Sequence, residues 1–231
     1  MTATPPVAAL AAGPERDCLR CPRLAAFRAK QRADFADWHN APVPSFGPLT
    51  ARLLIVGLAP GLRGANRTGR PFTGDYAGDL LYATLLRHGW ARGAYGAVPD
   101  DGLELVDCRI TNAVRCVPPE NKPEPSEVAA CRPFLAAEIA AMPQLKAILA
   151  LGATAHGATL SCLGLIRARY GFAHGAMHAL PSAMLLADSY HCSRYNTNTG
   201  RLTEAMFDAV FTAMRDRLEA AARSAAPALS S

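Results

Sequence analysis

The chain has 231 residues, half of which are apolar, and its formal net charge at pH 7 is +5. The length suits one domain with tails, and the absence of any unbroken run of roughly 18 apolar residues excludes a helical membrane-spanning protein. The mild excess of basic side chains is compatible with a polyanionic partner, although many enzymes with neutral ligands share it. The first residues have no basic n-region before their apolar part, so we expect a cytoplasmic protein without a secretory signal.

Flexible tails are predicted at residues 1–17 and 224–231, on either side of a single domain over residues 18–223. Within the domain, short apolar runs alternate with segments of helical periodicity. The apolar runs predict four buried strands, within residues 52–58, 103–114, 145–152 and 182–190. The periodic segments predict helices over residues 77–90, 125–142, 153–164 and 202–222. We expect Ser126 to be the N-cap of the second of these helices and Pro133 to kink it.

Apolar strands separated by helices are typical of the α/β class, here with a mainly parallel four-stranded sheet that is covered by helices on both faces. Ligands of such sheets bind in the loops at the carboxyl ends of the strands. Three unusual segments follow predicted strands at that edge: the glycine-rich segment Gly57–Asp75, residues 111–116, and the Asn- and Thr-rich residues 191–202. The sequence therefore predicts a binding site where these three segments meet.

Four of the seven cysteines form two spaced pairs. Cys18 and Cys21 make a C-x2-C pair near the N-terminus, and Cys116 and Cys131 follow far downstream. In a cytoplasmic protein we expect thiols or metal ligands rather than disulfides. Four thiolates hold either one zinc ion or one iron–sulfur cluster, and the spacing does not decide between the two. Unrelated buried thiols are the third interpretation.

The glycine-rich segment Gly57–Asp75 has a bare backbone that lets amide groups approach a ligand closely. It contains neither a P-loop motif nor G-x-G-x-x-G, so it does not indicate a nucleotide cofactor. Phe72 is suited to stack on a flat ring, with plain core packing as the alternative. Asp75 is suited to act on a water molecule or a developing cation, with capping of the next helix as the alternative.

His191 and Asn112 each stand at the carboxyl end of a predicted strand. His191 opens a polar loop whose side chains suit phosphate oxygens and base edges, which favours a functional histidine over a structural one. The amide of Asn112 both donates and accepts hydrogen bonds, as reading the edge of a pyrimidine requires. A turn-forming asparagine is the alternative.

Taken together, these segments resemble a known family, the iron–sulfur uracil-DNA glycosylases of bacteria and archaea, and within it the group called type b or family 5. The resemblance is carried by GLAPG with NRTGRPFTGD, by ITNAVRCVPPENKP, by SYHCSRYNTNTGRLT and by the four cysteines, and it covers roughly residues 18–203. It implies a three-layer α/β/α sandwich and a [4Fe–4S] cluster, rather than zinc, on Cys18, Cys21, Cys116 and Cys131. It also implies hydrolysis of the N-glycosidic bond of uracil in DNA, which leaves an abasic site, and action on other deaminated bases such as hypoxanthine. We expect a monomer whose partner is DNA, with no membrane contact.

The same resemblance implies roles for the residues at the predicted edge. We expect His191 to stabilise the departing uracil anion, and Asp75 to stabilise the sugar cation and orient water, since Ala59 stands where many uracil-DNA glycosylases carry Asp or Asn. The expected base pocket comprises Gly57, Leu58, Ala59, Pro60, Gly61, Phe72 and Asn112. The expected DNA contacts are Arg63, Arg67 and Arg70 on phosphates, together with Ser193 and with Arg194 or Tyr195 as a wedge in the minor groove.

One position departs from the family pattern. The last motif usually begins His-Pro-Ser, whereas here it reads His191-Cys192-Ser193, and we expect a less rigid loop because cysteine does not fix φ. This departure and Ala59 leave open a non-cleaving protein of the same fold that binds uracil or an abasic site. A zinc-stapled hydrolase acting on a small molecule is a further alternative.

Overall fold

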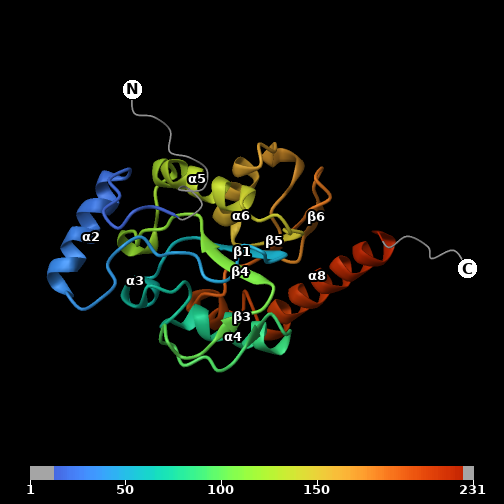
Figure 1. The fold of residues 1–231 in the computed structure, drawn as a ribbon, viewed down its shortest axis with the longest axis horizontal. Coiled ribbons are helices and arrows are strands. Elements are labelled where there is room, and N and C mark those ends of the chain that lie inside the picture. The colour runs from blue at the N-terminus through green and yellow to red at the C-terminus, as the bar shows by residue number, and fades with distance from the viewer. Residues whose placement is uncertain (1–12, 226–231) are drawn as a thin grey trace, which may run out of the picture.

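The computed structural model describes residues 13–225, and a five-stranded sheet forms its centre (Figure 1). Four strands are parallel and correspond to the four predicted ones, which confirms the α/β class with a mainly parallel sheet. The fifth strand is a short antiparallel edge strand that the sequence did not predict. In spatial order, the strands are β4 (Cys108–Asn112), β1 (Leu53–Gly57), β5 (Ala147–Leu151), β7 (Leu185–Ser189) and β6 (Met177–Ala179).

The parallel register brings the carboxyl ends of the four strands to one edge. Gly57 at the end of β1 pairs with Asn112 at the end of β4, and Leu151 of β5 pairs with Ser189 of β7. All five residues of β1 are buried, as they are in β5 and β7, because helices cover both faces of the sheet. The loops that leave these strands therefore meet at this edge.

Helices cover the two faces in separate layers, as the three-layer prediction requires (Figure 1). Alternate strand side chains point into each layer: Leu53 and Ile55 contribute to one core cluster, and Leu54 and Val56 to the other. The first cluster packs against α4 (Tyr76–Arg87) and α8 (Glu204–Ala225). The second packs against α5 (Pro125–Ala140) and α6 (Ala153–Cys162).

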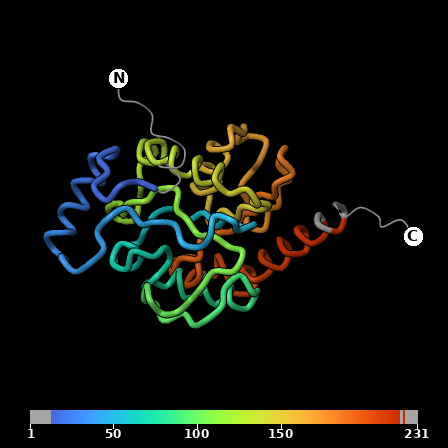
Figure 2. The backbone as a smooth tube through the Cα atoms, viewed as in Figure 1, coloured from blue at the N-terminus to red at the C-terminus, as the bar shows by residue number. Residues whose placement is uncertain are grey.

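Helix α2 (Pro22–Asp34) lies at one side of this sandwich, as the backbone trace shows (Figure 2). Its Leu24 is buried in a third, smaller apolar cluster that also contains Cys116, Cys131 and Phe134. The remaining short elements are α3 (Ala65–Thr68), a hairpin of β2 (Ala91–Arg92) and β3 (Glu104–Leu105), the 3-10 turns η1 (Pro119–Asn121) and η2 (Arg167–Arg169), and α7 (Arg194–Asn198). The N-terminal segment thus joins the body through cysteine-bearing apolar packing.

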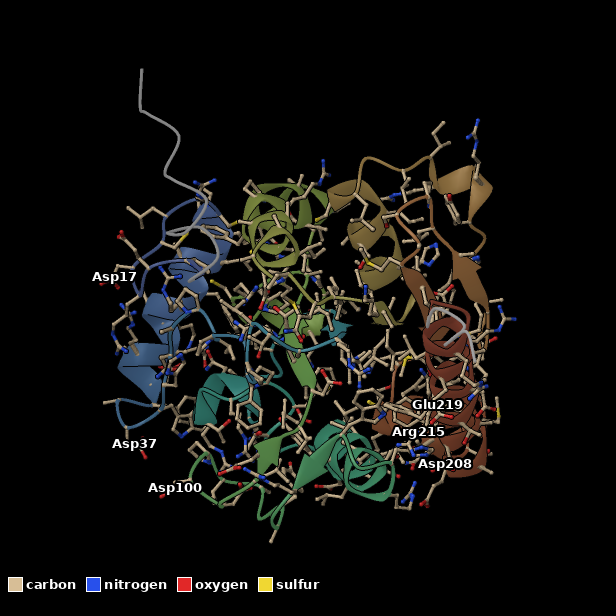
Figure 3. The ribbon with its side chains drawn as sticks, turned by 45° about the vertical axis from the view of Figure 1, so that its right-hand side comes forward. Asp17, Asp37, Asp100, Asp208, Arg215 and Glu219 are labelled. Carbon is tan, nitrogen blue, oxygen red and sulfur yellow. The ribbon has the colours of Figure 1, made fainter. Side chains whose placement is uncertain are left out.

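The predicted domain limits at residues 18 and 223 stay predictions, because most of the expected tails lie outside the described residues. Within the described part, Asp17 pairs with Arg32 of α2, and α8 continues to Ala225. Helix α8 is amphipathic: Phe207 and Phe211 are fully buried, whereas other positions carry charged side chains such as Asp208 and Glu219 (Figure 3).

The predicted N-cap of α5 is wrong by two residues. The helix begins at Pro125, and Glu124 is its N-cap in a capping box with Glu127. Proline is favoured at the first helical position, where its missing N–H would have had no partner, so the helix starts before Ser126. Pro133 lies inside α5, which continues through it to Ala140.

Candidate active site

A cleft of about 770 Å³ opens at the carboxyl edge of the sheet. Its walls come from the loop after β1, the end of β4 and the loop after β7, the three segments that the sequence singled out. The predicted site residues that line it are Leu58, Ala59, Pro60, Gly61, Arg63, Phe72, Asp75, Asn112, His191, Ser193 and Arg194. The structure therefore brings most of the predicted site together.

Because Gly57 has no side chain, Phe72 and Asn112 can pack closely against the end of β1. A Cβ at this position would lie 2.6 Å from Cζ of Phe72 and would overlap Oδ1 of Asn112. Phe72 is only 6% exposed and belongs to the core cluster, yet its ring also lines the cleft. Core packing of Phe72 is therefore observed, and its position in the cleft leaves room for the predicted stacking role, which stays a prediction.

Asn112 lines the cleft and carries an unpaired acceptor. The residue is 3% exposed, and its Oδ1 has no hydrogen-bond partner among the described residues. An unsatisfied buried acceptor costs about 1–3 kcal/mol, and natural proteins retain such groups chiefly where something else fills the need. Oδ1 of Asn112 is therefore available to accept a hydrogen bond from a ligand.

Asp75 caps the next helix, the alternative that the sequence left open, and its carboxylate also lines the cleft. It is the N-cap of α4, and its Oδ1 accepts a hydrogen bond from the Gly78 N–H at 3.2 Å. Its Oδ2 lies against the glycine-rich loop, where a Cβ at Gly61 would come within 2.8 Å of it and one at Gly64 would overlap it. Burial raises the pKa of Asp75, against the opposing effect of the backbone N–H groups of Gly78 and Ala77. The carboxylate is thus partly desolvated and faces the cleft.

His191 is a neutral imidazole beside Phe72. Burial lowers its pKa to about 4, so the ring carries no charge near neutral pH. Its ring centroid lies 5.8 Å from that of Phe72, with an interplanar angle of 26°. Its backbone carbonyl accepts a hydrogen bond of 2.8 Å from Nδ2 of Asn196, which fixes the start of the loop. A neutral, held imidazole is suited to donate a hydrogen bond to a developing anion.

Cys192 restrains the loop in its own way. Its side chain is fully buried in the core cluster, and its thiol donates to the Ala77 carbonyl at 3.4 Å. This contact ties the residue after His191 to the first turn of α4, next to Asp75. The restraint differs in kind from a proline, since it acts through the side chain and not through φ.

The predicted DNA-binding arginines separate into two groups. Arg63 is exposed and lines the cleft, and Arg67 is exposed beside it. The prediction for Arg70 is wrong, because its side chain is 5% exposed and forms a two-pronged ion pair with Asp101 at 2.7 and 2.8 Å. The same guanidinium lies over the rings of Tyr82 and Tyr95. The guanidinium binds Asp101 and the Pro99 carbonyl inside the protein, and it is too buried to contact a phosphate.

The loop after His191 presents its side chains at the rim. Ser193 is the N-cap of α7 and accepts a hydrogen bond from the Asn196 N–H. Arg194 is exposed and lies over the ring of Tyr76, 5.4 Å from its centroid. Tyr195 is 72% exposed and does not line the cleft itself. An exposed aromatic residue at such a rim is suited to contact a partner rather than the core.

Asn121 is a cleft residue that the sequence analysis missed. It lies in the turn η1 with φ of 57°, after Glu120 with φ of 54°. The signal was present in PPENKP, since asparagine tolerates the left-handed region and marks turns. Six further cleft residues were not predicted as site residues: Leu62, Gly64, Ala65, Gly74, Tyr76 and Ala77.

All four cysteines of the predicted metal set line one small pocket, together with Leu24, Arg28 and Phe134. Two N–H groups point at the sulfurs: Nη1 of Arg28 at 3.5 Å from Sγ of Cys116, and the Arg115 amide at 3.4 Å from Sγ of Cys131. The pocket joins the N-terminal segment to the body of the protein.

A second group of metal-ligating side chains lies outside this pocket. Among the described residues, only His156, His178 and Asp188 place three metal-ligating groups within 4.8 Å of one another, and Asp188 is hydrogen-bonded to both histidines.

A comparison with protein families identifies the class. The family model of the uracil DNA glycosylase superfamily matches residues 44–215, and the chain is a member of that superfamily. A type-5 uracil-DNA glycosylase of Thermus thermophilus is 45% identical over 195 residues, which cover 82% of this chain and 89% of the relative. A type-5 enzyme of Pyrobaculum aerophilum is 41% identical over 191 residues, which cover 81% and 83%.

A type-4 uracil-DNA glycosylase of Thermotoga maritima matches less of the chain, with 42% identity over 111 residues, or 47% of this chain and 49% of the relative. The chain therefore belongs to the type-5 uracil-DNA glycosylases, which confirms the predicted family. Among the described residues, no helix is both long enough and apolar enough to span a membrane.

Proposed function

We propose that this protein removes uracil from DNA by hydrolysing the N-glycosidic bond, leaving an abasic site. The unpaired Oδ1 of Asn112, a residue that lines the cleft, carries this proposal. Uracil has an N3–H donor next to its O4 acceptor, and an amide matches that pair of groups with its own acceptor and donor. The type-5 relatives, named as uracil-DNA glycosylases, point to the same substrate.

The base reaches the cleft by leaving the helical stack, at a cost of a few kcal/mol. Phe72 offers a ring for stacking and Asn112 the edge contact. A ring inserted between two others needs a separation of about 7 Å between them, whereas the centroids of Phe72 and His191 lie 5.8 Å apart. His191 therefore approaches the base from its edge, near O2, and not from its second face.

Bond cleavage produces a uracil anion and a sugar with cationic character. His191 donates its N–H to the anion, and the backbone N–H groups of residues 57–61, among which Pro60 has none, add to this stabilisation. Ala59 has no group for the cation, and Asp75 is the only carboxylate among the described residues that line the cleft. Asp75 thus stabilises the cation and accepts a proton from the attacking water. Asn121, in the turn η1, completes the lining of the cleft.

The test is incubation with an oligonucleotide that contains one uracil, followed by alkali, which cuts the strand at an abasic site. Strand scission at the uracil supports the proposal. Binding to the oligonucleotide without scission would instead support a non-cleaving protein of the same fold. Hypoxanthine in the same position tests the wider substrate range that the family resemblance implies, which we include in the proposal. The cytoplasmic location and the monomeric state stay predictions.

We also propose that Cys18, Cys21, Cys116 and Cys131 hold a [4Fe–4S] cluster. Their convergence on one pocket supports it. The N–H groups of Arg28 and Arg115 would stabilise the charged sulfurs. In this position, the cluster supplies a structural cross-link between the N-terminal segment and the body.

We expect the purified protein to contain iron and to show the broad visible absorbance of an iron–sulfur cluster. Cys116→Ser should remove both and lower the melting temperature, because a metal site contributes its binding energy to folding. Cys162→Ser, at a thiol outside the pocket, should keep iron and absorbance. Purified protein with stoichiometric zinc and no colour would contradict the cluster.

Arg194 is the expected wedge into the minor groove. We expect Arg194→Ala to slow uracil release from duplex DNA by about tenfold, as losing a contact worth 1–2 kcal/mol would do. Release from single strands should change little, since no base pair has to be opened there. Equal losses on both substrates would show that Arg194 binds phosphate rather than acting as a wedge.

A further inference from the structure

The loop that carries Asn121 is strained. Glu120 and Asn121 are adjacent and both lie in the left-handed region, with φ of 54° and 57°. This region costs an ordinary L-residue about 1–2 kcal/mol, although asparagine tolerates it. Such strain persists only where the surrounding structure fixes the backbone. The loop between β4 and α5 therefore depends on restraints at both of its ends.

The upstream restraint is the cysteine pocket. Cys116 lines that pocket, and Val117 beside it is 1% exposed. The turn itself has only two short-range backbone bonds, from the Asn121 amide to the Pro118 carbonyl and from the Lys122 amide to the Pro119 carbonyl. The exposed side chains of Glu120 and Lys122 pair weakly with each other at 3.4 Å. These contacts join residues of the turn to one another, so they do not attach its downstream half to the body of the protein.

The downstream restraint comes from Arg23 of α2. Its Nη2 donates to the Lys122 carbonyl at 3.1 Å, directly after Asn121. The same guanidinium forms a two-pronged pair with Glu127, at 2.8 and 2.7 Å, and lies 3.1 Å from the carboxylate of Glu124. Arg23 thus contacts the loop and both members of the capping box at the start of α5 with one planar group, a geometry that lysine does not reproduce.

Glu127 holds the guanidinium of Arg23 in place. Its side chain is 5% exposed, and it also accepts a hydrogen bond of 2.7 Å from the Glu124 amide. Burial on its own would raise the pKa of Glu127, but the hydrogen bond from Arg23 outweighs it with the help of the Glu124 amide, so the pKa lies below its usual value. Removing Arg23 would leave the buried carboxylate of Glu127 without its cationic partner, which is energetically costly.

We propose that Arg23 is a positioning residue that holds the Asn121 loop against the cleft, so that the rim of the base pocket is coupled to the cysteine-bearing segment. Arg23 lies two residues after Cys21, and Leu24 next to it is buried in the cysteine cluster. The segment that carries Cys18 and Cys21 therefore also positions the guanidinium of Arg23 against the Asn121 loop. The functional part of this inference rests on the proposed uracil-excising activity.

The first test is hydrogen exchange on the full-length protein with its cysteine site loaded. Arg23→Gln should speed the exchange of the amides of Asn121 and Lys122, with little change in the strands and an unaltered visible absorbance. Arg32→Gln is the matched control, because Arg32 is on the same helix, has similar exposure and pairs with Asp17 instead. Unchanged exchange at residues 120–122 in the Arg23 variant would overturn the proposal.

The second test is a double-mutant cycle on single-turnover uracil release. We expect Arg23→Gln to slow release by about tenfold, because a misplaced side chain loses reactive geometry. In a protein that already carries Asn121→Ala, Arg23→Gln should slow release by no more than about twofold further. Both substitutions then remove the same contribution, that of the Asn121 side chain. Arg23→Lys should recover only part of the loss. Full additivity would show that Arg23 does not act through Asn121.

The two tests separate this inference from the proposed function. A wild-type protein that releases no uracil would refute the activity, and the exchange experiment would still decide whether Arg23 holds the loop. A Arg23→Gln variant that loses its absorbance or melts far below the control would show that Arg23 serves the cysteine site itself, which contradicts a role specific to the loop.

Discussion

Asp75→Asn is expected to slow uracil release by about 10²–10⁴-fold under single-turnover conditions, the usual contribution of a positioned acid–base group. The reason is that Asp75 is the only carboxylate among the described residues lining the cleft, while Ala59 offers no substitute. Asparagine is nearly isosteric and keeps the side-chain oxygen, but it carries no negative charge for the sugar cation and accepts no proton from water.

The capping role of Asp75 makes the choice of variant important. Asparagine is as good an N-cap as aspartate, so Asp75→Asn should leave α4 and the melting temperature nearly unchanged. Asp75→Ala should lose the cap as well, at a cost of about 0.5–2 kcal/mol. Both variants should bind uracil-containing DNA as the wild type does. Release by Asp75→Asn within a few-fold of the wild type would remove Asp75 from the mechanism.

His191→Ala is the second change with a large expected effect. Removing one preorganised donor to a developing anion costs about 10²–10³-fold in rate. His191→Asn places an amide donor at the same point of the loop and should recover part of the loss, which a purely steric role would not predict. Equal rates for the alanine and asparagine variants would argue against hydrogen-bond donation.

The lowered pKa of His191 has a consequence for stability. The unfolded chain binds a proton at this position below its ordinary pKa of 6.5, whereas the folded protein binds it only near pH 4. Between these values the unfolded state holds more protons, so this residue lowers the stability of the fold as the pH falls through that window. Relative to His191→Gln, the wild type should therefore lose stability to urea between pH 7 and pH 5. No difference in this pH dependence would mean that the imidazole is well solvated.

The sequence predicted the site well where it depended on parallel strands. Gly57 and Asn112 are 55 residues apart in the chain, yet parallel pairing of β1 with β4 necessarily sets their ends side by side. The loops after those strands then had to meet, and Phe72, Asp75 and His191 all line one cleft. Fold class and the main site residues followed from this geometry.

Other features depended on contacts that no local pattern contains. Arg70 was predicted as a phosphate contact in a basic loop, but Asp101 from a separate segment pairs with its guanidinium, and the side chain is buried. The edge strand β6 has only three residues, too few for a periodic signal. Asn121 lies in the cleft because of a strained turn, and Arg23 of α2 contacts that turn at the Lys122 carbonyl. These are tertiary effects, which spacing along the chain does not encode.

The central claim is that the cleft holds an extruded uracil, stacked on Phe72 with its edge on Asn112. The most direct measurement is a crystal structure of the Asp75→Asn variant with a duplex that contains one uracil. We expect the uracil outside the stack, its N3–H hydrogen-bonded to Oδ1 of Asn112, its ring on Phe72 and its O2 within reach of His191. A uracil that stays paired in the duplex, or a bound base that leaves Oδ1 of Asn112 without a donor, would contradict it.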